Sequence, residues 1–165
     1  MKPRPPLTTA IATVMLSLAL PAMAAPDPND WNAVLQAAEG QTVYWNAWGG
    51  DSRTNRYIAW VSEQMQSTYG VDVEHVKLDD TGSAVARVLG EKQAGNMDDG
   101  RIDLIWINGE NFAAMREQDL LFGPFAESLP NFALTHPDEN PEVVTDFTLP
   151  TEGYESPWGK AQITF

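Results

Sequence analysis

Three short polar stretches carry the residue types that could bind a small molecule. They are residues 46–51, 79–83 and 108–111, and each follows a strand-like run and precedes a helix-like pattern. Indole faces attract cations and stack on flat rings, and carboxylates around a cation add to that attraction. The candidate ligand-binding residues are Trp45, Asn46, Trp48, Gly49, Asp51, Asp80, Thr81, Ser83, Asn108, Gly109, Glu110, Asn111 and, later in the chain, Tyr154.

The third polar stretch marks the clearest transition from a strand to a helix. Residues 103–107 are apolar and rich in β-branched types, which is typical of a strand covered on both faces. Residues 110–118 are predicted to form a helix with Phe112 on its inner face and Asn108 as its N-cap. Capping and turn chemistry alone would also explain the polar residues at this turn.

Two earlier units repeat this layout of strand, polar turn and helix. The predicted elements are a helix over 31–38, a strand over 41–48, a helix that Asp51 or Ser52 caps and Gly70 ends, a strand over 71–78, and a helix that follows Ser83. Strands that alternate with amphipathic helices imply an α/β fold with a mainly parallel sheet and right-handed crossovers. All three polar turns would then lie along one edge of the sheet and face one cleft.

Several kinds of site are absent from the sequence. The chain has no cysteine, which excludes disulfides, thiol catalysis and thiolate metal sites. Its two histidines, His75 and His136, lack metal-ligand spacing, and His75 reads as a strand residue. No phosphate loop, dinucleotide fingerprint or Gly-x-Ser-x-Gly elbow occurs, so we expect no cofactor.

The first 24 residues are typical of a secretory signal peptide. Lys2 and Arg4 precede a short apolar stretch, and Ala22-Met23-Ala24 supplies small residues at the cleavage site. Cleavage after Ala24 would leave eight basic and 23 acidic residues, a net charge of −15. We therefore expect an exported, soluble, periplasmic protein that does not bind nucleic acid, because phosphate-backbone binding relies on basic patches.

Beyond residue 121 the periodic pattern is lost. Prolines recur through residues 122–150, which indicates a wandering connection with little to pack on after Pro130. Residues 151–165 are predicted to begin a new strand, and the strand-like end at Ile163-Thr164-Phe165 reads as that of a fragment.

Four segments together resemble the extracellular solute-binding proteins of bacterial ABC importers, most closely a branch described as thiamine-like. They are the signal peptide, Val43-Tyr44-Trp45-Asn46-Ala47-Trp48-Gly49-Gly50, the run from Asp103 to Phe112, and the run from Gly153 to Gln162. The resemblance spans about residues 40–165.

The resemblance implies a two-lobe, type II periplasmic-binding-protein-like fold that captures a small molecule and delivers it to an inner-membrane permease. Residues 25–150 would form the first α/β lobe, and residues 151–165 would begin the hinge crossing into a second lobe that this chain lacks. Such a protein is a monomer and not an enzyme.

Two questions stay open at the level of sequence. A secreted hydrolase could use paired carboxylates such as Asp51 with Asp80 or Glu110. For a binding protein, the tryptophans and carboxylates favour a cationic, possibly aromatic solute, whereas helix N-termini on the same edge favour anions.

Overall fold

A computed structural model of the chain describes residues 25–97 and 100–159. The predicted signal peptide (residues 1–24) and the predicted strand at Ile163-Thr164-Phe165 lie outside the described residues.

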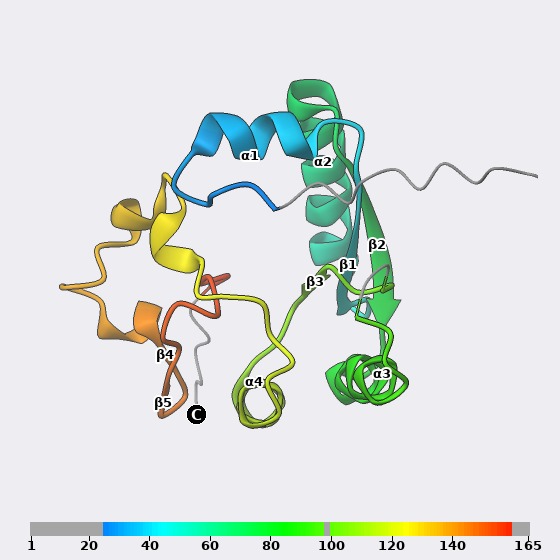
Figure 1. The fold of residues 1–165 in the computed structure, drawn as a ribbon, viewed down its shortest axis with the longest axis vertical. Coiled ribbons are helices and arrows are strands. Elements are labelled where there is room, and N and C mark those ends of the chain that lie inside the picture. Colours follow the sequence, from blue (N-terminus) through cyan, green and yellow to red (C-terminus); the bar gives the residue numbers. More distant parts are fainter. Residues whose placement is uncertain (1–24, 98–99, 160–165) are drawn as a thin grey trace, which may run out of the picture.

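A three-stranded parallel sheet forms the centre of the fold (Figure 1). Its strands are β1 (Thr42–Trp48), β2 (Asp72–Leu78) and β3 (Leu104–Ile105), in the order β2-β1-β3. Each residue of β1 pairs with one of β2, from Thr42 with Asp72 to Trp48 with Leu78, and β3 pairs only with Trp45 and Asn46. The α/β class and the parallel pairing predicted from the sequence are therefore confirmed.

Four α-helices accompany the sheet, with bounds close to those predicted. They are α1 (Trp31–Ala38), α2 (Ser52–Tyr69), α3 (Thr81–Gln93) and α4 (Gly109–Glu117). Figure 1 shows α2 running alongside the strands, and α3 and α4 seen end-on below them. Gly70 ends α2 in a left-handed conformation with φ of +68°, as its position predicted. None of the helices in residues 25–97 and 100–159 is long and apolar enough to cross a membrane.

The core lies between β1 and α2. Trp45, Ala47 and Ile58 are buried there, with partly buried Val61, Val73 and Trp106 packed around them. On α4, Phe112 and Met115 are buried, which confirms the predicted inner face of that helix. Packing of β1 against α2 fixes the positions from which the polar turns leave the sheet.

The third strand, β3, is shorter and more exposed than the sequence predicted. It is a two-residue edge strand, and Leu104 is 44% exposed rather than covered on both faces. The carboxylate of Asp103 accepts a hydrogen bond from the backbone N–H of Tyr44 at 2.8 Å, so a side chain takes one of the ladder positions. This pairing by a side chain shortens the regular strand.

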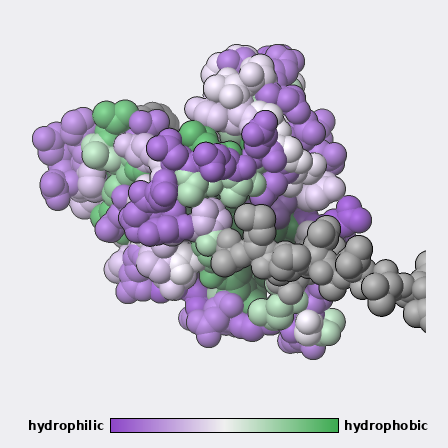
Figure 2. Space-filling model, turned by 45° about the horizontal axis from the view of Figure 1, so that its top comes forward, coloured by the Kyte–Doolittle hydropathy of each residue, from purple (hydrophilic) through white to green (hydrophobic). Residues whose placement is uncertain are grey.

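Residues 122–150 form short elements rather than a structureless connection. These are the 3-10 helices η1 (Ala126–Ser128), η2 (Phe132–Thr135) and η3 (Pro141–Val144), and an antiparallel hairpin of β4 (Thr145–Asp146) and β5 (Leu149–Pro150). Figure 2 shows separate apolar patches on a largely hydrophilic surface. The large exposed side chains of this part of the chain include Phe122, Leu134 and Phe147.

The chain then turns back toward α4 through residues 151–159, here called the return segment. Thr151 is only 5% exposed, and the Gly153 carbonyl accepts hydrogen bonds from the N–H groups of Phe125 (2.8 Å) and Ala126 (3.0 Å). The expectation that this part of the chain has little to pack on is wrong. The return segment also contains no strand, because Gly153 has φ of +77° and Pro157 has no N–H to pair.

Candidate functional site

The starts of α2, α3 and α4 lie along one edge of the sheet, where its three parallel strands end. The Thr81 hydroxyl lies 3.5 Å from the Trp106 carbonyl oxygen, which joins the start of α3 to the end of β3. A β-carbon placed on Gly82 would lie 3.6 Å from Oδ1 of Asn111, so the starts of α3 and α4 are neighbours. The three polar turns therefore lie along one edge of the sheet, as predicted, whereas their facing one cleft stays a prediction.

At the start of α2, the carboxylate of Asp51 is bound by the chain itself. It accepts hydrogen bonds from the Thr54 N–H (2.7 Å) and the Thr54 hydroxyl (2.8 Å), and these bonds lower the pKa of Asp51 below its usual value. The preceding glycines make room for neighbouring side chains. A β-carbon would lie 2.7 Å from the Lys77 side chain at Gly49 and 2.4 Å from the Trp48 indole at Gly50.

At the start of α3, the carboxylate of Asp80 is likewise bound by the chain itself. Its carboxylate accepts a hydrogen bond from the Gly82 N–H at 3.2 Å. The hydroxyl of Ser83 donates to the Asp80 carbonyl oxygen at 2.7 Å and therefore serves the turn itself.

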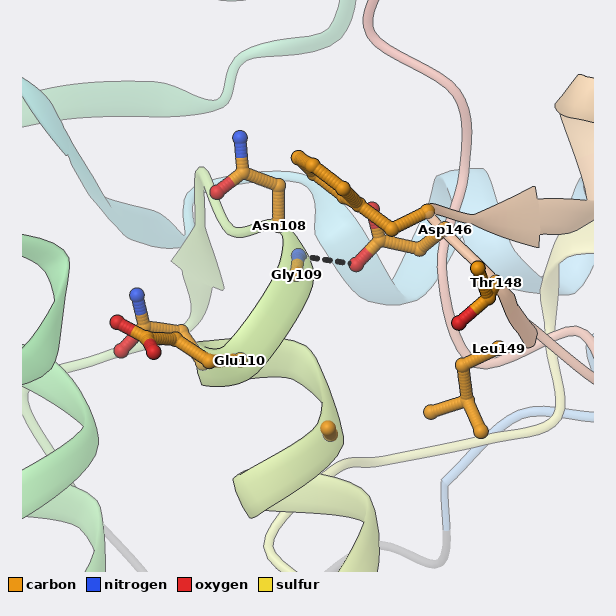
Figure 3. Close-up of a pocket in the computed structure, with 9 residues that line it drawn as sticks. Asn108, Gly109, Glu110, Asp146, Thr148 and Leu149 are labelled. Atoms are coloured by element: carbon orange, nitrogen blue, oxygen red, sulfur yellow. Dashed lines mark hydrogen bonds between the residues drawn. The ribbon is translucent and has the colours of Figure 1, made fainter.

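The start of α4 is capped by a residue from another part of the chain. Asn108 occupies the N-cap position, but its side chain makes no capping hydrogen bond. Instead the carboxylate of Asp146 in β4 accepts a hydrogen bond from the Gly109 N–H (Figure 3). Gly109 has φ of +55°, and a β-carbon there would lie 3.4 Å from the Phe147 ring. The hairpin thus lies against the helix start and replaces the predicted Asn108 cap.

A pocket of about 510 Å³ lies between the α4 start and the β4–β5 hairpin. Figure 3 shows Thr148 and Leu149 on the hairpin side, and Glu110 extending from the other side of the helix start. Among the predicted site residues, the pocket brings together Asn108, Gly109, Glu110 and Asn111. Sequence reasoning missed the rest of its lining, namely Ala113, Asp146, Phe147, Thr148 and Leu149.

Two predicted site residues of β1 are core residues instead. Trp45 is 7% exposed and Asn46 is 2% exposed. The Asn46 side-chain amide donates to the carbonyl oxygens of Tyr44 (3.2 Å) and Arg101 (3.3 Å), which satisfies its buried donors within the chain. Trp48, at the end of the strand, is 47% exposed. Trp45 and Trp48 therefore differ in exposure, as expected for strand residues three apart, which point to opposite faces of the sheet.

Tyr154 also lies away from the pocket lining. The Arg116 guanidinium stands 3.8 Å from the centroid of its ring, and the same guanidinium pairs with Glu152. A β-carbon on Gly123 would lie 2.8 Å from the Tyr154 ring. Tyr154 thus attaches the return segment to α4.

An aromatic cluster lies near the ends of the parallel strands. Trp158 of the return segment contacts Trp45 (5.5 Å between ring centroids), Tyr57 (5.5 Å) and Trp106 (5.0 Å), and these four residues define the cluster. Trp158 is 46% exposed, so one part of its ring is open to solvent. Its role was not predicted, although it lies within the Pro157-Trp158-Gly159 sequence that contributes to the family resemblance.

A second carboxyl group lies near Asp146. Burial, and to a lesser extent the negative charge of Asp146, together raise the pKa of Glu155 to about 7. Burial also raises the pKa of Asp146, against the lowering effect of the Gly109 N–H. Within the described ranges, no group of three or more His, Cys, Asp or Glu residues could hold a metal ion.

Comparison with known proteins gives one curated relative. Protein YnjB of Escherichia coli (strain K12) is 46% identical to this chain over 137 residues, which are 83% of this chain and 35% of YnjB. No family model and no solved structure matches the chain. The chain therefore spans about a third of the length of a bacterial relative whose name states no activity.

Proposed function

We propose that this chain is the first-lobe part of an exported solute-binding protein that captures a small molecule for a bacterial ABC importer. The observation that carries the proposal is the arrangement at the sheet edge. Three parallel strands bring three polar helix starts together, and an open pocket of about 510 Å³ lies at one of them. Ligands of open α/β sheets bind outside the carboxyl ends of the strands.

The proposal includes a two-lobe, type II architecture in which residues 25–150 form the first lobe and residues 151–165 begin the hinge crossing. Two observations support a cleft on this side. The pocket is open, and Trp48 and Trp158 near the strand ends are each about half exposed. A partner lobe would close over this edge and cover these aromatic faces. The site would be periplasmic, and the permease would sit in the inner membrane.

The charge at the helix starts favours a cationic solute over an anionic one. A helix N-terminus attracts anions through its free N–H groups. At this edge Asp51, Asp80 and Asp146 already supply a carboxylate to α2, α3 and α4 respectively. An anionic solute would have to displace these groups or lie beside them.

Aromatic groups give a second reason for the same preference. A cation within about 6 Å of an indole centroid gains roughly 0.5–2 kcal/mol, and nearby carboxylates add to this attraction. Glu110 is one of the residues that line the pocket, with its carboxylate extending from the other side of the helix start (Figure 3), and Trp106 lies two residues before the pocket residue Asn108. A positively charged, possibly aromatic molecule therefore suits the site best.

The hydrolase alternative has less support. Asp51 and Asp80 are each bound within their own helix start, and Glu155, whose pKa is raised to about 7, does not line the pocket. Of the carboxylates that the sequence suggested for hydrolysis, Asp51, Asp80 and Glu110, only Glu110 lines the pocket, so the suggested pairs do not meet there. We propose a binding protein and not an enzyme.

The proposal is tested on the protein encoded by the full open reading frame that contains this chain. Calorimetric titration should detect saturable binding of an organic cation and weaker or no binding of sugars and anions. Permease and ATPase genes beside that reading frame would support import. Binding of anions alone would contradict the charge argument but not solute capture, whereas hydrolysis of a panel member would overturn the proposal.

A further inference from the structure

The return segment is fastened to the rest of the molecule at two points before it reaches Trp158. The Gly153 carbonyl accepts hydrogen bonds from Phe125 and Ala126, which fixes its backbone. On α4, the Arg116 guanidinium pairs with the exposed carboxylate of Glu152 and stacks on Tyr154. Residues 151–154 are therefore held in place by backbone hydrogen bonds and by a side-chain contact with α4.

The far end of the segment contacts the rest of the molecule through the Trp158 ring. Trp158 lies in the aromatic cluster, with ring centroids 5.0–5.5 Å from Trp106, Tyr57 and Trp45. It remains 46% exposed, so the contact is partial. Aromatic pairs of this geometry add only a modest stabilisation beyond burial, which a single electrostatic change nearby can offset.

Glu155 lies between these two attachments and is the unfavourable group in the segment. Its Oε2 atom is buried without a hydrogen-bond partner in residues 25–97 and 100–159. The charged group that acts on it is Asp146 of β4, whose carboxylate is bound to the Gly109 N–H of α4. The one cation placed on this part of α4, Arg116, is engaged by Glu152. Among the described residues, a second negative charge at Glu155 therefore has no ion-pair partner.

We propose that docking of the return segment is linked to a proton on Glu155: the neutral carboxyl lets the segment lie against Asp146, and its ionisation loosens Trp158 from the aromatic cluster. The raised pKa of Glu155, about 7, places the transition near neutral pH. This inference goes beyond solute capture and does not depend on it, because it concerns contacts within the chain.

Acrylamide quenching of tryptophan fluorescence tests the proposal, since acrylamide is neutral and its access to Trp158 reports docking. In the unaltered chain, acrylamide quenching of tryptophan fluorescence should increase between pH 6 and 8 with a midpoint near 7. Trp158→Phe should remove the pH-dependent part. Glu155→Gln, which keeps the shape and cannot ionise, should give low quenching at all these pH values, and Asp146→Asn should shift the midpoint to lower pH.

Glu127→Gln is the matched control, because Glu127 is an exposed carboxylate on η1. It should leave the midpoint unchanged. Circular dichroism at pH 6 establishes that each variant keeps its secondary structure. A transition that persists unchanged in Glu155→Gln, or no transition in the unaltered chain, would overturn the proposal.

Discussion

The carboxylate of Asp146 binds the backbone N–H of Gly109, although the two residues lie 37 positions apart in the chain. A hairpin side chain thus caps α4 and forms one wall of the pocket at the same time. This bond couples the stability of the hairpin to the shape of the candidate site.

Removal of that carboxylate should destabilise the protein. We expect Asp146→Ala to lower the free energy of unfolding by about 0.5–2 kcal/mol, the usual cost of losing a helix N-cap. Asp146→Asn keeps an acceptor oxygen and should cost less. Urea denaturation measures the difference, with Asp138→Ala as a control at an exposed aspartate. Equal stability of Asp146→Ala and the control would show that the bond contributes nothing.

Glu155 should make stability depend on pH. Its pKa in the folded protein, about 7, lies above the ordinary value of 4.5, so the folded state holds the proton more tightly than the unfolded state. The stabilisation from this group is fully present below about pH 4.5 and is lost as pH rises through 7. Glu155→Gln should therefore become more stable relative to the unaltered chain between pH 5 and 8. Urea midpoints at pH 5, 6, 7 and 8 that run parallel for the two proteins would contradict this.

Asn46 should behave as a structural residue. Its amide is 2% exposed and donates two hydrogen bonds to backbone carbonyls. Asn46→Ala should lower the free energy of unfolding by about 1–3 kcal/mol, because two part-buried hydrogen bonds are lost, each contributing about 0.5–1.5 kcal/mol. Asn131→Ala, at an exposed asparagine, is the control. A thermal melt in which both variants match the unaltered chain would refute the structural role.

Local patterns were sufficient for the elements whose causes are local. The alternation and β-branched content of β2, the Gly70 stop after α2 and the Asp51 and Asp80 turns are all readable within a few residues. From these elements, the parallel sheet and its polar edge could be predicted without coordinates.

The missed features depend on contacts between distant segments. Asp146 caps a helix that begins 37 residues earlier, and Trp158 packs on Trp45 and Trp106, which both lie more than 50 residues earlier in the chain. No periodicity or spacing rule connects such positions. Asn108 was predicted as the N-cap of α4 because the local sequence gives no sign that Asp146 lies at the start of this helix.

The most direct measurement of the central claim is calorimetric titration of Glu110→Gln against an organic cation that binds the full-length protein. Glu110 is an exposed residue among those that line the pocket, so the variant should lose the salt-sensitive share of affinity and keep its melting temperature. Glu117→Gln, on the last turn of the same helix, should bind as the unaltered protein does. Unchanged affinity in Glu110→Gln would mean that Glu110 acts only as a charge in the first turn of α4. Failure of every organic cation to bind the full-length protein would contradict the proposal of a cationic solute.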